Sequence, residues 1–499
     1  MQQSFFFYDY ETTGIDPKCD RILQFAGIRT DPEFNIISDP IACYSQLSSE
    51  VIPNPQALLV TGITPEVLTK QGLSEIKFLT SIYREFVQPY TCVVGYNNIR
   101  FDDEFTRYAF YRNFFDPYAR EWQNNNSRFD LIDVVRMCSA LRPDGILWPK
   151  NTENNKPSFK LNDLTIANNL NHEKAHDALS DVYATIEIAK LIYKAQPKLL
   201  NYLLQMRKKD FINNLINLNG LFDHNKAIKS KLFVHSTRMV SSEYYATSVF
   251  LPLLRDPINI NGIICWDLRY DPELLLGLNN ITDREKIAKL IYAPTSEPRL
   301  NLKTLFVNKS PAIAPLTALD HASYQRIQLQ EDVIINRAEL ILAQQNTWLE
   351  ALTDFFSIKP DFANKDVEHM LYDGFIANQD KYFCSRVLTS PEHKLIDLQN
   401  NFTDARLKEL MFRYRARNYP QTLSKDEQTR WQQYCQSRLD NTNKSASISK
   451  QQFIDQCEVI LNDINISIQD KQIINQWLSY YQVNQTINAT QREEECLSQ

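Results

Sequence analysis

Two acidic residues end the first apolar run of the chain. Asp9 and Glu11 stand one residue apart in FFFYDYE, a segment whose composition is typical of a β-strand. Side chains alternate across a strand, so residues i and i+2 share a face. Two carboxylates on one face repel each other unless a cation lies between them. Mg²⁺ and Mn²⁺ prefer such oxygen ligands. Because such triplets are common, a solvated turn after an edge strand is the simpler reading of this triplet by itself.

Further candidate groups stand later in the sequence. Asp102 and Asp103 follow the strand-like run TCVVGY and a turn, where an acid can cap a helix as well as bind a metal. His176 and Asp181 have the spacing H-x₄-D at the entry to an amphipathic stretch. They would not share a face if both were helical, so we expect His176 in the preceding loop and Asp181 one turn into the helix. A histidine beside carboxylates is a candidate general base for a water molecule.

Residues 172–176 read HEKAH, which is a literal HExxH motif. In zinc proteases this motif makes two histidines ligands and its glutamate the base, here His172, His176 and Glu173. The motif follows NNLN, which prefers turns, and Asp177 has the character of a helix start. The two histidines are therefore not expected to share a helical turn, and the zinc reading is the weaker alternative.

The elements that must position these residues fall into three regions. The first is α/β in pattern, and the second is a small, mostly β, barrel-like region with one helical stretch near 283–291. A polar segment at 357–366 reads as a linker to a helical third region, and the polar end of the chain has no periodicity. In the first region we expect strands at 5–9, 25–30, 41–47 and 91–96, and helices around 79–86, 131–138, 161–167 and 177–194.

Composition excludes several classes of protein. The chain has 499 residues, 43% of them apolar, and a net charge of −6, which argues against a uniformly basic nucleic-acid binder. Its ten glycines form neither GxGxxG nor GxxxxGK[ST], so a dinucleotide site or a P-loop is not expected. Nine scattered cysteines without a CxxC pair favour a reducing compartment, and no apolar stretch has the length of a membrane span. These features predict a cytoplasmic protein.

The motifs together resemble a known family. FYDYETTG, GYNNIRFDDEF and HDALSDVYAT stand in the order of the DEDDh (DnaQ-like) 3′→5′ exonucleases. DRILQFAGIRTD, LRPDGILWP and RYRARNYP are similar to bacterial exonuclease I, and the resemblance runs from about residue 5 to 483. It implies an α/β RNase H-like (DnaQ-like) exonuclease domain at 1–196, an SH3-like β-barrel domain at 197–356 and an α-helical C-terminal domain at 357–483. The polar end at 484–499 is predicted from its composition to be a disordered tail.

The resemblance also implies a chemistry. Asp9, Glu11, Asp102 and Asp181 match the family's four metal-binding acids, and His176 matches its general base. The implied reaction is two-metal-ion hydrolysis of single-stranded DNA in the 3′→5′ direction to 5′-mononucleotides, in DNA repair and recombination. The ions would be two Mg²⁺, with Mn²⁺ as a substitute.

Two other functions compete with this one. Related enzymes that act on RNA ends are short and lack some 300 residues that this chain has after residue 196. A non-catalytic DNA-binding protein would not need all five matching residues.

Binding a single strand requires cationic and aromatic side chains. Residues 198–243 include eight Lys or Arg residues and only three acids, so this segment is basic. In RYRARNYP, arginines alternate with tyrosines and other residues. The family also binds the acidic C-terminal tail of single-stranded DNA-binding protein, for which Arg142, Tyr202 and Lys231 are candidates. We expect a monomer with no membrane attachment. By family position, the expected DNA contacts are Glu11, Arg107, Tyr118, Trp122, Arg136, Lys160 and Lys209.

Overall fold

A six-stranded mixed sheet forms the centre of the N-terminal region. The computed structural model describes residues 3–170, 177–281, 283–294, 296–358, 365–442 and 444–481. The strand order is β4-β3-β2-β1-β5-β6; β1 runs antiparallel to β2 and parallel to β5, and β6 extends the parallel part. The strands are β1 (Ser4–Thr12), β2 (Ile22–Thr30), β3 (Ile41–Ser45), β4 (Gly72–Leu73), β5 (Thr91–Gly95) and β6 (Ser127–Asp130).

Strand β1 is buried on both faces because its side chains alternate between two hydrophobic cores. Phe5 and Phe7 pack on the side covered by α5 (Leu131–Leu141) and α7 (Ala178–Ala195). Phe6 and Tyr8 pack on the opposite side, against α3 (Glu75–Phe86) and α4 (Asp102–Arg112). The remaining helices of this region are α1 (Pro55–Thr61), α2 (Pro65–Gln71) and α6 (Leu161–Ala167).

The middle region holds a five-stranded antiparallel sheet in the order β10-β9-β8-β7-β11. Its strands are β7 (Phe233–Ser236), β8 (Thr247–Arg255), β9 (Gly262–Asp267), β10 (Leu302–Phe306) and β11 (Ala312–Pro315). The region is more helical than the sequence pattern predicted. Its helices are α8 (Pro197–Leu203), α9 (Lys209–Ile216), α10 (Glu273–Leu276), α11 (Arg284–Tyr292), α12 (His321–Arg326), α13 (Glu331–Ala343) and α14 (Leu349–Ser357).

The C-terminal region is helical and contains no strand within 365–442 and 444–481, as its sequence pattern predicts. Its helices are α15 (Asn378–Thr389), α16 (Leu395–Asn401), α17 (Ala405–Asn418), α18 (Lys425–Leu439) and α19 (Lys450–Asn462), and residues 468–481 are also helical. The tail at 484–499, predicted to be disordered, lies outside the described residues.

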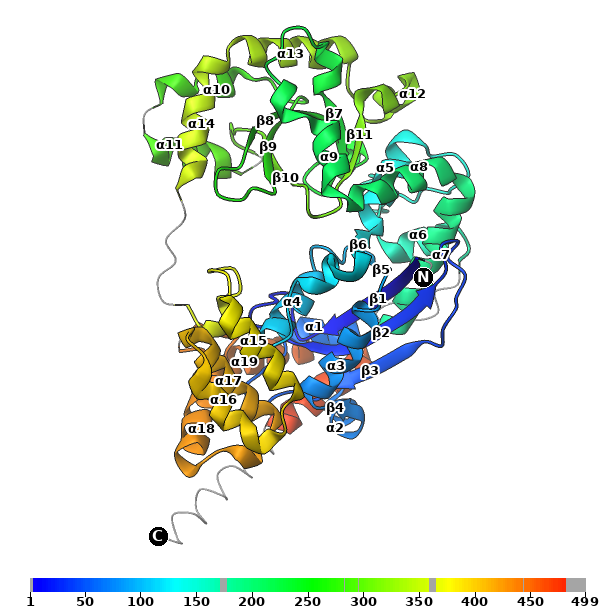
Figure 1. The fold of residues 1–499 in the computed structure, drawn as a ribbon. Helices are drawn as coiled ribbons and strands as arrows, with labels where there is room; N and C mark the ends of the chain where they lie inside the picture. Colours follow the sequence, from blue (N-terminus) through cyan, green and yellow to red (C-terminus); the bar gives the residue numbers. More distant parts are fainter. Residues whose placement is uncertain are drawn as a thin grey trace.

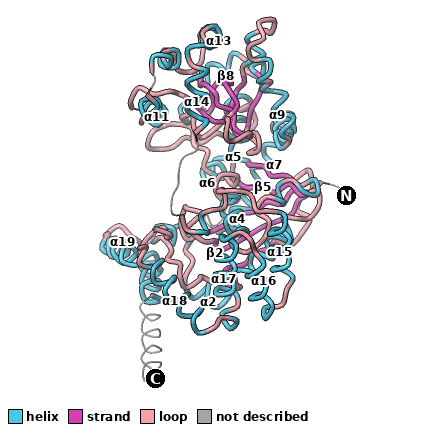
Figure 2. The backbone as a smooth tube through the Cα atoms, turned by 60° about the vertical axis from the view of Figure 1, so that its left-hand side comes forward, coloured by secondary structure: helices cyan, strands magenta, loops and turns pink. Residues whose placement is uncertain are grey.

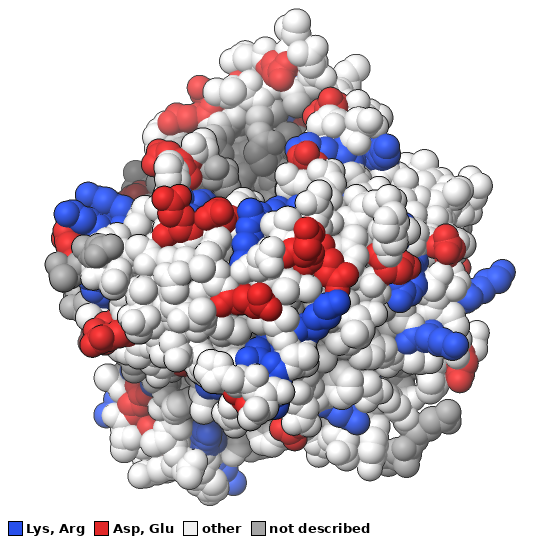
Figure 3. Space-filling model, turned by 90° about the horizontal axis from the view of Figure 1, so that it is seen from above, with Lys and Arg blue, Asp and Glu red and all other residues white. Residues whose placement is uncertain are grey.

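The middle region and the C-terminal region pack against different ends of the N-terminal region, which contains the six-stranded sheet (Figures 1 and 2). The middle region contacts one end of it through α5, which touches β7, β11 and α12. The C-terminal helices pack on the other end, where α17 contacts α3 and α19 contacts α1. Seen from the side of the middle region, basic and acidic side chains are interspersed over the surface (Figure 3), in keeping with the net charge of −6. Among the described residues no helix is long and apolar enough to cross a membrane.

Candidate active site

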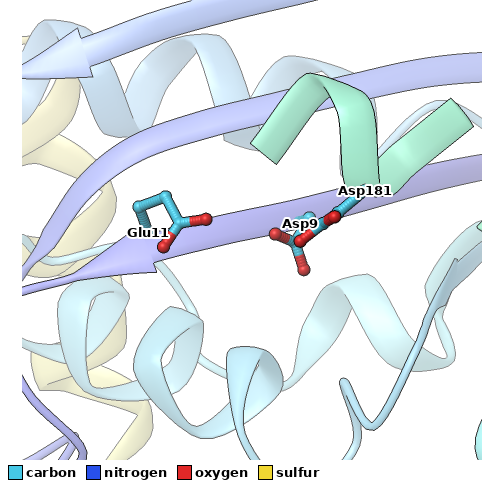
Figure 4. Close-up of side chains that lie close together, drawn as sticks. All are labelled: Asp9, Glu11 and Asp181. Atoms are coloured by element: carbon cyan, nitrogen blue, oxygen red, sulfur yellow. The ribbon is translucent and has the colours of Figure 1, made fainter. Parts of the chain in front are cut away.

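Three carboxylates converge beside the central strand. Asp9 and Glu11 extend from β1 and Asp181 from the first turn of α7, and one oxygen of each lies within 4.8 Å of the others (Figure 4). The strand alternation therefore places Asp9 and Glu11 on one face. Helix α7 begins at Ala178 after Asp177, whose side chain caps it by accepting a hydrogen bond from the Ser180 backbone N–H at 3.2 Å.

Asp102 and Asp103 open α4 but have different surroundings. Asp103 is completely buried and accepts hydrogen bonds from Tyr8 Oη (2.7 Å), Arg120 Nη2 (2.6 Å) and Arg128 Nη1 (2.8 Å). Asp102 is also buried, but among the described residues its Oδ1 has no hydrogen-bond partner. The charge of Asp102 acts on Asp9, although Asp102 is not one of the three acids whose oxygens lie within 4.8 Å of one another. Neither acid caps α4, because both lie in its first turn and the N-cap residue is Phe101, which forms no side-chain cap hydrogen bond.

Asp130, at the end of β6, holds the loop that leads into α4. Its carboxylate accepts hydrogen bonds from the backbone N–H groups of Asn97 (2.8 Å) and Ile99 (3.2 Å), and it also caps α5 through Ile132 (3.1 Å). Asn97 has a φ of +69°, a conformation that asparagine tolerates better than most residues. These hydrogen bonds fix the position of Asp102, which is the first residue of α4.

The repulsion between the clustered acids favours the binding of a cation. Burial, followed by the charges of Asp9 and Asp181, raises the pKa of Glu11 to about 9. Burial and the charges of Asp102 and Asp181 likewise raise the pKa of Asp9 well above its usual value. The oxygens of Asp9, Glu11 and Asp181 lie close together and repel one another when ionised, which is the kind of donor set that a hard divalent cation binds. Asp102 offers a further buried oxygen that has no hydrogen-bond partner among the described residues.

His176 and the HEKAH motif of residues 172–176 lie outside the described residues. The role of His176 therefore stays a prediction, and the structure gives no geometry for His172 or Glu173.

A cleft of about 2010 Å³ runs between the three regions. Of the predicted DNA contacts, Arg107, Tyr118, Trp122 and Lys209 line it; Trp122 is 65% exposed. Arg136 and Lys160 are not among the described residues that line this cleft.

The cationic candidates for DNA binding differ in how exposed they are and in whether they already pair with an acid. Arg107 is buried and pairs with Glu121 (2.8 Å) and Glu104 (3.0 Å), while its guanidinium lies 5.3 Å from the Tyr118 ring centre. Arg136 pairs with Asp133 at 2.5 Å. Lys160 and Lys209 are exposed.

The arginines of RYRARNYP are not an exposed cationic track, contrary to our expectation. Arg413 pairs with Asp366 (2.7 Å), Arg415 with Glu427 (2.7 Å) and Arg417 with Glu50 (2.7 Å). All three side chains are nearly inaccessible, because they hold the helical region together and fasten it to the N-terminal region.

A second hollow of about 850 Å³ includes Glu11 and shares Lys18 and His369 with the large cleft. The two hollows therefore adjoin at these residues. His369 was not singled out from the sequence, because an isolated histidine 358 residues beyond Glu11 gives no local signal of its position.

The candidate partner residues lie near the junction with the middle region. Arg142 donates to the Ala318 carbonyl (3.1 Å) and lies 3.9 Å from Asp320, while Tyr202 is half-buried with no hydrogen-bond partner for its hydroxyl among the described residues. Lys231 is half-buried in a short helix that contacts α13.

Family models match the whole architecture in order. The model described as Exonuclease matches residues 6–189, the Exonuclease I SH3-like domain 207–358 and the Exonuclease I C-terminal domain 365–484. The chain is 40% identical over 455 residues to exodeoxyribonuclease I of Haemophilus influenzae, covering 91% of this chain and 94% of that one. This chain belongs to the exodeoxyribonuclease I family.

Solved structures of this family superpose closely on the chain. Exonuclease I of Escherichia coli in complex with a dA16 oligonucleotide is 35% identical, with a TM-score of 0.89 over 96% of this chain and 99% of that one. The zinc ion bound form of the E. coli enzyme with single-stranded DNA is 35% identical, with a TM-score of 0.88 over 97% and 99%. The predicted fold class is confirmed: an RNase H-like exonuclease domain, an SH3-like domain and a helical C-terminal domain. Membership of this family gives no support to the protease reading of HEKAH.

Proposed function

We propose that the chain hydrolyses single-stranded DNA from its 3′ end and releases 5′-mononucleotides. The observation that carries the proposal is the convergence of Asp9, Glu11 and Asp181. Asp102 adds a buried Oδ1 that has no hydrogen-bond partner among the described residues. Membership of the exodeoxyribonuclease I family and the DNA bound in a solved relative support it. The 3′→5′ direction rests on the family resemblance.

In this proposal Asp9, Glu11, Asp102 and Asp181 hold two Mg²⁺ ions, for which Mn²⁺ can substitute. Bound there, the ions would supply Lewis-acid activation of water and offset charge on the phosphate. The chain's own part is to hold the four carboxylates in fixed positions, through the β1 register, the α7 cap and the Asp130 anchor of the α4 loop, whereas the bound ions would favour their ionised forms. These constraints position the donor oxygens before any ligand arrives.

His176 completes the proposed site as general base. A neutral imidazole accepts a proton at a ring nitrogen near neutral pH, and neighbouring carboxylates stabilise the imidazolium that results. This role rests on the match of HDALSDVYAT to the family motif.

The large cleft is the proposed path of the strand. Lys209 supplies positive charge, Trp122 supplies an exposed ring, and Tyr118 lies beside Arg107 in the wall. Such a combination binds phosphates and bases with little sequence preference. We keep Arg136 and Lys160 as proposed contacts outside the cleft walls.

The remaining predictions stay part of the proposal. They are a cytoplasmic monomer acting in repair and recombination, the domain limits 1–196, 197–356 and 357–483, and an acidic peptide from single-stranded DNA-binding protein near Arg142, Tyr202 and Lys231. The eight described cysteines are free thiols, which agrees with a reducing compartment.

The direct test is digestion of single strands labelled at either end, with Mg²⁺ or with EDTA. We expect a 3′-labelled strand to release labelled mononucleotide at once, and a 5′-labelled strand to shorten stepwise, only with Mg²⁺. An RNA strand of the same sequence is the control and should persist. Faster loss of RNA than DNA, or label released first from the 5′ end, would overturn the proposal.

A further inference from the structure

Helix α1 forms one wall of the smaller hollow that contains Glu11. That wall consists of the cap residue Asn54 together with Gln56, Ala57, Val60 and Thr61. The four helical residues among them lie on one face of α1, and Val60 on that face is 51% exposed. The backbone N–H of Asn54 also donates to the Thr13 carbonyl (2.7 Å), two residues beyond Glu11. The position of α1 therefore sets the width of the hollow beside the acids.

The opposite face of α1 packs on the C-terminal region. Leu58 is completely buried and belongs to a hydrophobic core that includes Phe453 of α19 and Trp477. A helix of seven residues is too short to be stable alone, so the place of α1 depends on this packing. Helix α1 thus stands between the hollow on one side and the C-terminal region on the other.

Two aromatic side chains from the helical residues 468–481 hold the chain on both sides of α1. The completely buried Trp477 donates from Nε1 to the Ile63 carbonyl (2.9 Å), just after α1. The Tyr481 hydroxyl donates to the Val51 carbonyl (2.9 Å), shortly before α1. Trp477 and Tyr481 are one helical turn apart, and their stacked ring centres are 6.2 Å apart. Because both acceptors are backbone carbonyls, these bonds fix the path of the chain into and out of α1.

We propose that Trp477 and Tyr481 are positioning residues for hydrolysis, because they fix α1 and thereby the hollow that receives the last nucleotide of the strand. The inference rests on the proposed function, in which the strand end lies at the acids and its last nucleotide reaches beyond Glu11. Neither side chain lines the described hollows, so both act through α1. The C-terminal region is in this way part of the geometry of the active site.

Two substitutions remove one of these hydrogen bonds each and keep an aromatic ring. Trp477→Phe loses the donor to Ile63, and Tyr481→Phe loses the donor to Val51. Tyr480→Phe is the matched control, because it removes the same hydroxyl group from the neighbouring residue. No hydrogen bond of the Tyr480 hydroxyl is seen among the described residues.

Single-turnover release of the last nucleotide is measured with Mg²⁺ for two kinds of strand, one with an ordinary end and one whose last nucleotide lacks its base. Strand affinity is measured in EDTA, and folding by thermal denaturation. We expect Trp477→Phe and Tyr481→Phe to slow release from ordinary ends about tenfold while affinity stays within about twofold, since a displaced wall misplaces the bound end. Both variants should also lose much of the preference for ordinary over base-free ends, whereas Tyr480→Phe should keep it.

This preference separates positioning from simple stabilisation, which would lower the melting temperature and leave the preference unchanged. The same preference in the unchanged chain, Trp477→Phe and Tyr481→Phe would overturn the inference. If Trp477→Phe does not fold, Tyr481→Phe decides the question, because it removes only a hydroxyl. An unchanged chain that prefers neither end would also overturn the inference, and one that releases no nucleotide at all would overturn the proposed function itself.

Discussion

Neighbouring carboxylates at the start of α4 have opposite roles in the electrostatics of the protein. For Asp103, burial alone would raise the pKa, but the guanidinium groups of Arg120 and Arg128 outweigh burial and hold this pKa below its usual value. For Asp102, burial and the nearby acids raise the pKa well above its usual value. Asp103 is thus a structural anion, whereas Asp102 is an acid whose ionised form needs a cation.

This contrast predicts opposite effects of two matched substitutions. Asp103→Asn leaves two buried arginines short of a charge partner and should lower the free energy of unfolding by about 3–5 kcal/mol. Asp102→Asn removes a carboxylate that repels its neighbours, so its melting temperature in EDTA should equal or exceed that of the unchanged chain. Thermal denaturation followed by circular dichroism measures both.

Activity supplies the control for this pair. Asp102→Asn should lose at least about 100-fold in DNA hydrolysis while remaining folded. A fully active Asp102→Asn, or an Asp103→Asn as stable as the unchanged chain, would contradict the assignment.

Strand β1 and helix α7, which carry Asp9, Glu11 and Asp181, are among the elements that sequence reasoning located, β1 from its apolar run and α7 from its helical spacing. The DxE spacing placed Asp9 and Glu11 on one face, and the helix start at Asp177 placed Asp181 in the first turn. The choice between Asp102 and Asp103 could not come from spacing, since both stand in the same helical turn. The difference between the two acids depends on Arg120 and Arg128, which come from later segments of the chain and pair with Asp103.

Other elements were missed for physical reasons. Strands β6 (SRFD) and β11 (AIAP) have four residues each, too few for a periodic signal. The middle region was predicted to be mostly β because most of its helices are short; α13 (Glu331–Ala343), with 13 residues, is the exception. The arginines of α17 were taken for a surface track, since sequence does not show that acids as far away as Glu50 pair with them. His176 lies outside the described residues, so its placement stays a prediction.

A buried ionic cluster joins the N-terminal and C-terminal regions of the whole molecule. Glu368 pairs with Arg21 (2.7 Å), Arg413 (3.3 Å) and Arg417, and Arg417 also binds Glu50. Burial alone would raise the pKa of Glu368, but the charges of Arg417, Arg21 and Arg413 outweigh it and hold the pKa well below 4.5. The cluster fastens the segment around Arg21, ten residues after Glu11, to the helical domain.

The cluster predicts a dependence of stability on pH. Because the pKa of Glu368 is lower in the folded than in the unfolded chain, its contribution is complete above about pH 4.5 and is lost as pH falls below that value. Melting temperatures between pH 7 and pH 3 should therefore fall steeply at the acid end. Glu368→Gln should be less stable at pH 7 by about 3–5 kcal/mol and show a shallower acid decline. Parallel curves for the two proteins would argue against the cluster as the source.

The central claim is that Asp9, Glu11, Asp102 and Asp181 together bind divalent cations, and binding of Mn²⁺ tests it most directly. Free Mn²⁺ gives an electron paramagnetic resonance signal that falls as the ion is bound, so a titration counts bound ions without any substrate. We predict that the unchanged chain removes Mn²⁺ from solution, that Mg²⁺ competes, and that Asp9→Asn and Asp181→Asn each bind at least about tenfold more weakly. The same depletion of Mn²⁺ by the unchanged chain and by both variants would contradict the account.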